Sequence, residues 1–304
     1  MPQLAIFLST LVWGATFPAT KAALAHIPPF SFLAFRFLLG TLLVLGLFFA
    51  LGQRLSMDRR LLRISGIATG FLFLGYVTQT VGLQYTSASN SAFITALYVI
   101  FTPLYLGRFG GRIWLSAGLA LAGLWLLVNP SVSVNVGDLL TLACAAAFAG
   151  HIACLETYTR EGQPWAFFLW QMLFTTILMV PAMAVEGPQA GQLVPTLVVS
   201  LALFITGVLA TGAFAVQIWA QQLLPAQQVA LIFSLEPAYA AWLSWYFLGE
   251  RLDAQGWVGS GLILVAVVLG SLAPQKELSE DEVRHSSLVI RKNELPKSVP
   301  TNNG

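Results

Sequence analysis

Long apolar runs without charge recur along almost the whole chain. The hydrocarbon core of a bilayer is about 30 Å thick, so a helix needs about 20 apolar residues to cross it. Ten such runs cover residues 4–24, 30–51, 64–84, 91–107, 113–128, 137–155, 165–185, 198–217, 228–248 and 256–273. The pattern predicts an all-α integral membrane protein with ten transmembrane helices.

The composition excludes an ordinary soluble enzyme. Only 9% of the 304 residues are charged and 57% are hydrophobic, whereas soluble domains carry about 25% charged residues. The net charge of +2 is too small to indicate a nucleic-acid partner. Cys144 and Cys154 fall in one predicted helix, about 15 Å apart along its axis, so they cannot bridge within it. We expect no metal site and no cofactor.

The basic residues predict an orientation. With the N-terminus in the cytoplasm, the outer loops contain only Lys21 and Arg251, and Arg36 lies inside the second apolar run. The cytoplasmic loops and the C-terminal segment hold Arg54, Arg59, Arg60, Arg63, Arg108, Arg112, Arg160, Lys276, Arg284, Arg291, Lys292 and Lys297. This asymmetry is the positive-inside signal and predicts that both termini are cytoplasmic. Residues 274–304 are polar and charged, and we expect a disordered tail there.

The two halves of the chain resemble each other. "PFSFLAFR" at 29–36 aligns without gaps on "PWAFFLWQ" at 164–171, which pairs Arg36 with Gln171. Two further matches follow in the same order: "SNSAFITALYV" at 89–99 with "QQVALIFSLEP" at 227–237, and "WLSAGL" at 114–119 with "WVGSGL" at 257–262. The slowly growing offsets indicate a duplication rather than chance similarity.

The duplicated unit has five helices, an odd number. The second unit therefore crosses the membrane in the opposite sense to the first, as in the inverted repeats of many secondary transporters. We expect one repeat over residues 1–130 and the other over 131–273. Such halves would let one site open to either side, with a small-molecule substrate and with or without proton exchange.

Several motifs resemble the EamA-type members of the drug/metabolite transporter superfamily. They are "WGATFP", "FRFLLG", "GLQYTSASNSAFITALYVIFTPL" and "ALIFSLEPAYAAWLSWYFLGERL". The resemblance covers about residues 1–273 and implies export of small metabolites, such as amino acids or amphipathic compounds, across a bacterial inner membrane. It also implies a central cavity lined mainly by helices 1, 3, 4, 6, 8 and 9. The sequence departs from the family pattern at "GRFGGR", residues 107–112, where the second half has "LGERL".

Ionisable residues inside the apolar runs are candidate functional groups, because lipid does not tolerate unpaired charge. Arg36 could bind a substrate carboxylate or clamp a neighbouring helix. His151 could bind substrate, exchange protons or be satisfied by a backbone carbonyl. Glu236 could carry a proton or only support its helix, since a Glu-Pro pair is a recurring feature of the family. The aligned pair in the first half is Tyr98 and Val99, where we expect an unbroken backbone.

Polar and aromatic side chains complete the candidate cavity. Gln79 and Gln217 occupy equivalent positions in the two halves, and Tyr76 lies one turn before Gln79. Each glutamine could contact substrate or join the two halves. The remaining candidates are Trp13, Tyr98, Trp170 and Gln171.

The spacing of Gly66 and Gly70 predicts close packing of the third helix.

Two alternatives stay open at this point. One is a passive facilitator or a nucleotide-sugar-like exchanger. The other is a membrane scaffold that moves no solute. No catalytic constellation or ATP-binding loop is present, so an enzyme and a primary pump are not expected. The sequence does not decide between a monomer and a homodimer.

Overall fold

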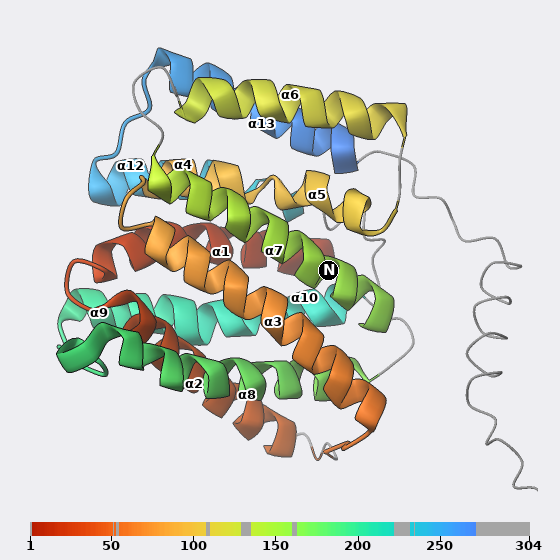
Figure 1. Ribbon diagram of the computed structural model, residues 1–304, viewed down its shortest axis with the longest axis vertical. Helices are drawn as coiled ribbons and strands as arrows, with labels where there is room; N and C mark the ends of the chain where they lie inside the picture. The colour runs from red at the N-terminus through yellow and green to blue at the C-terminus, as the bar shows by residue number, and fades with distance from the viewer. Residues whose placement is uncertain are drawn as a thin grey trace, which may run out of the picture. The chain divides into compact units, whose positions relative to one another are not determined.

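The computed structural model describes residues 2–50, 52, 55–107, 110–128, 135–159, 163–221, 232–233 and 235–271. The predicted disordered tail, 274–304, lies outside these residues, and so do residues 228–231 and 234 of the predicted run 228–248. Figure 1 shows the arrangement of the helices and their labels.

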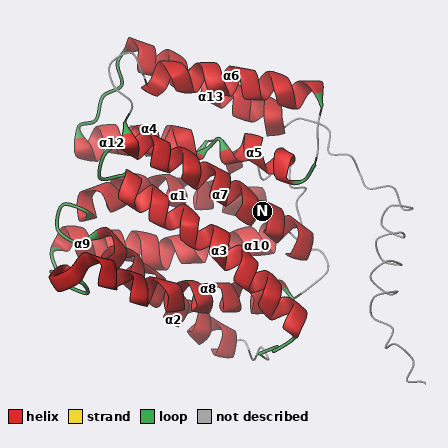
Figure 2. Ribbon diagram, viewed as in Figure 1, coloured by secondary structure: helices red, strands yellow, loops and turns green. Residues whose placement is uncertain are grey.

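The described chain consists of helices joined by short connections, without strands (Figure 2). The α-helices of the first half are α1 Pro2–Ala23, α2 Pro29–Ala50, α3 Arg59–Gly82, α4 Ala88–Thr95, α5 Tyr98–Tyr105 and α6 Gly111–Val128. The second half contains α7 Val136–Thr159, α8 Pro164–Ala182, the 3₁₀ helix η1 Met183–Gln189, α9 Leu197–Leu203, the π-helix η2 Phe204–Leu209, α10 Ala210–Gln221, α12 Glu236–Leu248 and α13 Ala254–Ser271.

These elements follow the predicted apolar runs. Six of the described helical stretches are long and apolar enough to cross a membrane, and α6 and α13 are shorter apolar helices. Two runs are divided: α4 and α5 share the fourth, while α9, η2 and α10 share the eighth. The protein is an all-helical membrane protein.

Small residues let some helices approach closely. α6 packs along α13 at the top of Figure 1, where a Cβ on Gly123 would lie 2.7 Å from the carbonyl oxygen of Gly259. Side chains at this crossing would force the helices apart. The prediction for Gly66 and Gly70 was wrong for the described chain, because both are exposed and no atom lies within 4 Å of a Cβ built on either.

The fourth run is broken at Ala96 and Leu97. At this turn Leu97 N donates to Ile94 O, Val99 N to Ala96 O and Ile100 N to Leu97 O, which are tighter bonds than the α-helical ladder makes. The expectation of an unbroken backbone at Tyr98 and Val99 was therefore wrong. Tyr98 begins α5 as Glu236 begins α12, so both aligned positions start a helix inside the bundle.

Two glutamates from the second half cap helices of the first half. Glu186, in η1, accepts hydrogen bonds from Phe30 N at 2.6 Å and Ser31 Oγ at 2.5 Å. Glu250, in the loop before α13, accepts from Ala88 N at 2.8 Å and Ser89 Oγ at 2.9 Å. These bonds satisfy N–H groups in the first turns of α2 and α4, where negative charge is also favoured by the helix dipole.

Lys21 makes a third tie, because its Nζ donates to the carbonyl oxygens of Leu83 at 2.6 Å and Thr86 at 2.8 Å. Lys21, Glu186 and Glu250 thus hold neighbouring segments together. Glu250 belongs to the "LGERL" motif of the second half.

We predict that Glu250→Gln lowers the stability of the folded protein by about 1 to 1.5 kcal/mol, because a hydrogen bond to a charged acceptor is replaced by a weaker neutral one. Thermal unfolding of the purified protein in detergent measures the change. The neighbouring exposed Arg251→Gln is the matched control and should leave the midpoint unchanged. Equal midpoints for the two variants would contradict a capping role for Glu250.

Candidate functional site

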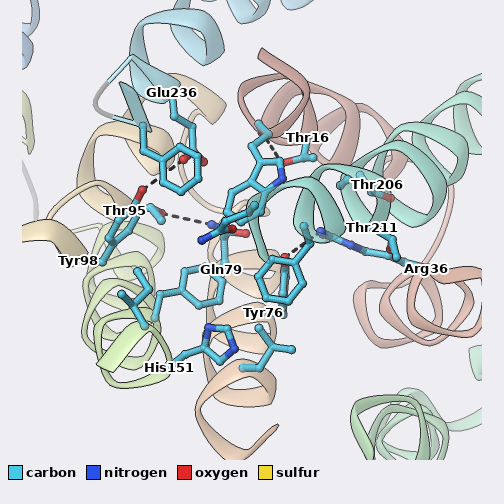
Figure 3. Close-up of a pocket in the computed structure, with 18 of the residues that line it drawn as sticks. Thr16, Arg36, Tyr76, Gln79, Thr95, Tyr98, His151, Thr206, Thr211 and Glu236 are labelled. Atoms are coloured by element: carbon cyan, nitrogen blue, oxygen red, sulfur yellow. Dashed lines mark hydrogen bonds between the residues drawn. The ribbon is translucent and has the colours of Figure 1, made fainter. Parts of the chain in front are cut away.

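A cavity of about 90 Å³ lies among the helices. One water molecule needs about 10 to 15 Å³ of cavity volume, so this cavity has room for roughly six to nine water molecules. Its polar and ionisable lining residues are Trp13, Thr16, Arg36, Tyr76, Gln79, Thr95, Tyr98, His151, Thr206, Thr211, Gln217 and Glu236. They come from α1, α2, α3, α4, α5, α7, η2, α10 and α12 (Figure 3).

Eight of the ten candidate residues line this cavity: Trp13, Arg36, Tyr76, Gln79, Tyr98, His151, Gln217 and Glu236. The helices that the family resemblance implied all contribute to it. The second run contributes as well, through Arg36 and Phe37 of α2.

Arg36 is held by an aromatic neighbour. It is 5% exposed, and its Nη2 donates to Tyr76 Oη at 3.1 Å. The guanidinium carbon lies 4.2 Å from the centroid of the Tyr76 ring, which adds a cation–π interaction. Phe37 and Phe148 pack edge-on against the same ring. Tyr76 therefore fixes the position of the guanidinium on one side of the cavity.

Glu236 and Tyr98 meet at the starts of their helices. Tyr98 Oη donates to Glu236 Oε2 at 3.4 Å, and both residues are buried. The backbone of Glu236 is also held in place by α1, which approaches α12 closely. A Cβ on Gly14 would lie 2.8 Å from Tyr239 Cβ and 3.0 Å from the Glu236 carbonyl oxygen. Gly14, within "WGATFP", thus lets α1 reach the first turn of α12.

Gln79, Gln217 and Trp13 supply neutral polar groups. Gln79 Nε2 donates to Thr95 Oγ1 at 3.3 Å. Among the described residues, no hydrogen-bond partner is found for Gln217 Oε1 or for Trp13 Nε1, although both atoms are buried. The Trp13 ring stacks on Phe233 with centroids 5.6 Å apart. Buried groups without partners are costly, so a ligand that bonded them would gain free energy.

His151 is joined to Gln171 behind the cavity wall. The Gln171 amide nitrogen and His151 Nε2 form a buried hydrogen bond, and the imidazole ring stacks on Phe214. Gln171 does not line the cavity, because it is fully buried between α8 and its neighbours. It orients His151, which does line the cavity.

Trp170 lies elsewhere. Its Nε1 donates to Ser56 O, in the segment before α3, at 2.8 Å, and its ring packs on Phe174. It is absent from the cavity lining. Trp170 precedes Gln171 by one residue and therefore lies on a different face of α8. The depth of a residue along a helix does not show which face its side chain occupies.

Sequence reasoning missed Thr16, Thr95, Thr206 and Thr211, which also line the cavity. Thr206 lies in the π-helix η2, an irregularity that often occurs at functional sites. Its Oγ1 donates to Ala202 O at 2.7 Å, as threonines in ordinary helices do. The sequence did contain a signal for Thr206. At about 3.6 residues per helical turn, Thr206 falls near the same helix face as Gln217 in the same run.

The fold and the cavity define a class: a multi-pass helical membrane protein that encloses a solute-sized site lined by both polar and apolar side chains. The sequence matches the EamA-like transporter family over residues 1–129 and 135–272. The chain belongs to this family of transporters, which is not a family of enzymes.

Relatives agree with this assignment, and a solved structure shares the fold. An uncharacterized transporter of Archaeoglobus fulgidus is 36% identical over 276 residues, covering 89% of this chain and 85% of the relative. The threonine/homoserine exporter RhtA of Escherichia coli is 28% identical over 290 residues, covering 90% of this chain and 92% of the exporter. A protein of known crystal structure superposes with a TM-score of 0.65 at 18% identity, over 89% of this chain and 97% of that protein, and so shares the fold.

We predict that Tyr76→Phe lowers the unfolding midpoint in detergent, because it removes the hydroxyl that accepts from Arg36 while keeping the ring. The expected loss is about 1.5 to 3 kcal/mol, the usual range for a hydrogen bond to a charged group. Tyr76→Leu removes the cation–π interaction too and should lose more.

Tyr85→Phe is the matched control, since Tyr85 is exposed and its hydroxyl lies outside the cavity. If Tyr76→Phe unfolds at the same temperature as this control, Tyr76 does not hold Arg36 in place.

Proposed function

We propose that the protein is a secondary transporter that exports small metabolites, amino acids or amphipathic compounds, across a bacterial inner membrane by alternating access. The observation that carries this proposal is the cavity, in which the ionisable side chains of Arg36, His151 and Glu236 are buried among the helices of a transporter-family fold. Ionisable groups at such depth mark substrate or ion pathways. The name of RhtA as a threonine/homoserine exporter supports amino acids as the substrate class.

The proposal includes an inverted repeat, with one unit over residues 1–130 and the other over 131–273. Its support is the pairing of equivalent residues around the cavity. Tyr98 and Glu236 each begin a helix and contact each other, while Gln79 and Gln217 line the same cavity. Helices that are interrupted beside a central site are typical of transporters built from such repeats.

The orientation is also part of the proposal. With both termini cytoplasmic, Lys21, Glu186 and Glu250 lie toward the outer side, and the polar segment 274–304 forms a cytoplasmic tail. The support is the positive-inside distribution of arginine and lysine in the sequence.

We infer that Glu236 couples transport to protons. Its carboxylate is buried in the cavity with Tyr98 as its hydrogen-bond partner, and no ion pair to it is found in the described part of the chain. A buried carboxylate of this kind can take up a proton when its surroundings change. The protons, the solute and the lipid bilayer are then the partners that function requires.

Counterflow in liposomes separates the transport candidates. Purified protein is reconstituted, and the uptake of labelled L-threonine and L-homoserine is measured with and without a proton gradient. A coupled exporter responds to the gradient, whereas uptake that ignores the gradient indicates a passive facilitator or an exchanger. If no solute from a broad metabolite panel moves, the transporter proposal fails, and the alternative of a membrane scaffold that moves no solute replaces it.

We predict that Glu236→Gln abolishes the pH dependence of transport between about pH 5.5 and 8, because glutamine cannot carry a proton. Transport rates of both proteins are compared in liposomes of equal protein content. Glu250→Gln makes the same chemical change outside the cavity and should keep the pH dependence. A Glu236→Gln protein with an unchanged pH profile would assign Glu236 to structural support.

A further inference from the structure

A guanidinium, Arg36, and a carboxyl group, Glu236, line the same cavity, and no contact between the two groups is found. The hydrogen-bond partner of Arg36 is the hydroxyl of Tyr76, and that of Glu236 is the hydroxyl of Tyr98. Within the described ranges, no carboxylate is found paired with Arg36 and no cationic side chain is found paired with Glu236. Each charge is therefore held by a phenol where a purely structural charge would usually have a counter-ion.

The two charged groups occupy different sides of the cavity. In Figure 3 Arg36 lies with Tyr76 on one side, Glu236 lies with Tyr98 on the other, and Gln79 lies between them. The tyrosines keep the charges apart: Tyr76 stacks against the guanidinium, and the helix start at Tyr98 holds the Glu236 carboxylate. The two groups therefore stay apart, with part of the cavity and the Gln79 side chain between them.

Burial makes unpaired charges expensive. An uncompensated charge in a low-dielectric site loses hydration without gaining an ion pair, and a partner of opposite sign recovers part of that free energy. A solute with only a positive or only a negative group would satisfy one of the two side chains. A solute with both would satisfy Arg36 and Glu236 together.

We propose that the cavity binds a zwitterion, with its carboxylate on the Arg36 guanidinium and its ammonium on the Glu236 carboxylate. The inference rests on the proposed function, because it takes the cavity to be the transport site. The volume of about 90 Å³ suits a small amino acid better than a bulky amphipathic compound.

Two unpartnered atoms complete the specificity of this site. The indole N–H of Trp13 can donate and the amide oxygen of Gln217 can accept, and neither has a partner among the described residues. A side-chain hydroxyl on the solute does both at once. The apolar lining residues Leu72, Phe148, Met172, Phe214 and Phe233 would contact its methylene groups.

The first experiment is a thermal-shift screen of the L-amino acids on the purified full-length protein in detergent. The zwitterion proposal expects a concentration-dependent rise of the unfolding midpoint with at least one small, uncharged-side-chain amino acid. If no amino acid shifts the midpoint, the proposal is overturned. Liposomes that then transported a sugar or a simple cation would leave the transporter function standing, so the two failures are distinguishable.

The second experiment removes one charge of the solute at a time. For L-homoserine the probes are 3-aminopropan-1-ol, which lacks the carboxylate, and 4-hydroxybutyrate, which lacks the ammonium. Their dissociation constants are measured by competition with the labelled amino acid that gave the largest shift. Both probes should bind at least tenfold more weakly than L-homoserine, and equal affinity for either one would overturn the proposal.

Variants assign the charges to their side chains. Arg36→Gln should weaken L-homoserine and 4-hydroxybutyrate by about ten- to hundredfold and leave 3-aminopropan-1-ol unchanged, in line with the strength of charged hydrogen bonds. Glu236→Gln should weaken L-homoserine and 3-aminopropan-1-ol and leave 4-hydroxybutyrate unchanged. A purely structural role would weaken all three probes equally and would overturn the assignment. Arg251→Gln, outside the cavity, is the control.

Discussion

The hydrocarbon core of a bilayer offers no partner to a charge or to a free backbone group, and the organisation of this chain follows from that constraint. Arg36 and Glu236, which lie in apolar helices, are buried within the bundle and reach one cavity there. At the helix ends, Glu186 and Glu250 satisfy N–H groups that lipid would leave unbonded. Polar groups are thus collected in the cavity or used as ties between helices.

The interrupted helices give the cavity its chemistry. α5 begins at Tyr98 and α12 at Glu236, so two first turns face each other inside the protein. The close approach at Gly14 presses α1 against one of them. A continuous helix at either position would bond its own backbone and carry its side chains past the site. Interruption at mid-depth is therefore what brings a phenol and a carboxylate to the same small space, beside Trp13 of the continuous helix α1.

Sequence reasoning reached the membrane class, the helical segments and eight of the twelve polar residues that line the cavity, because a charge within an apolar run has few places to go. Arg36, His151 and Glu236 stood out for this reason. Sequence reasoning failed where no residue in the sequence marks the structural feature. No glycine or proline marks the break at Ala96 and Leu97, so the backbone there looked continuous. The depth of Trp170 in its apolar run did not show that its side chain points away from the cavity. Threonines such as Thr206 looked like ordinary helix residues, because their hydroxyls donate to carbonyl groups of their own helix.

The central claim is that the cavity opens in turn to both sides of the membrane. Thr16 lines the cavity, and a Thr16→Cys protein in which Cys144 and Cys154 are replaced by alanine carries one reactive thiol there. The measurement is its labelling by a membrane-impermeant maleimide, added separately to right-side-out and to inside-out vesicles. Alternating access predicts labelling from both sides, slowed by a bound solute in each case. Labelling from one side alone, or from neither, would contradict it.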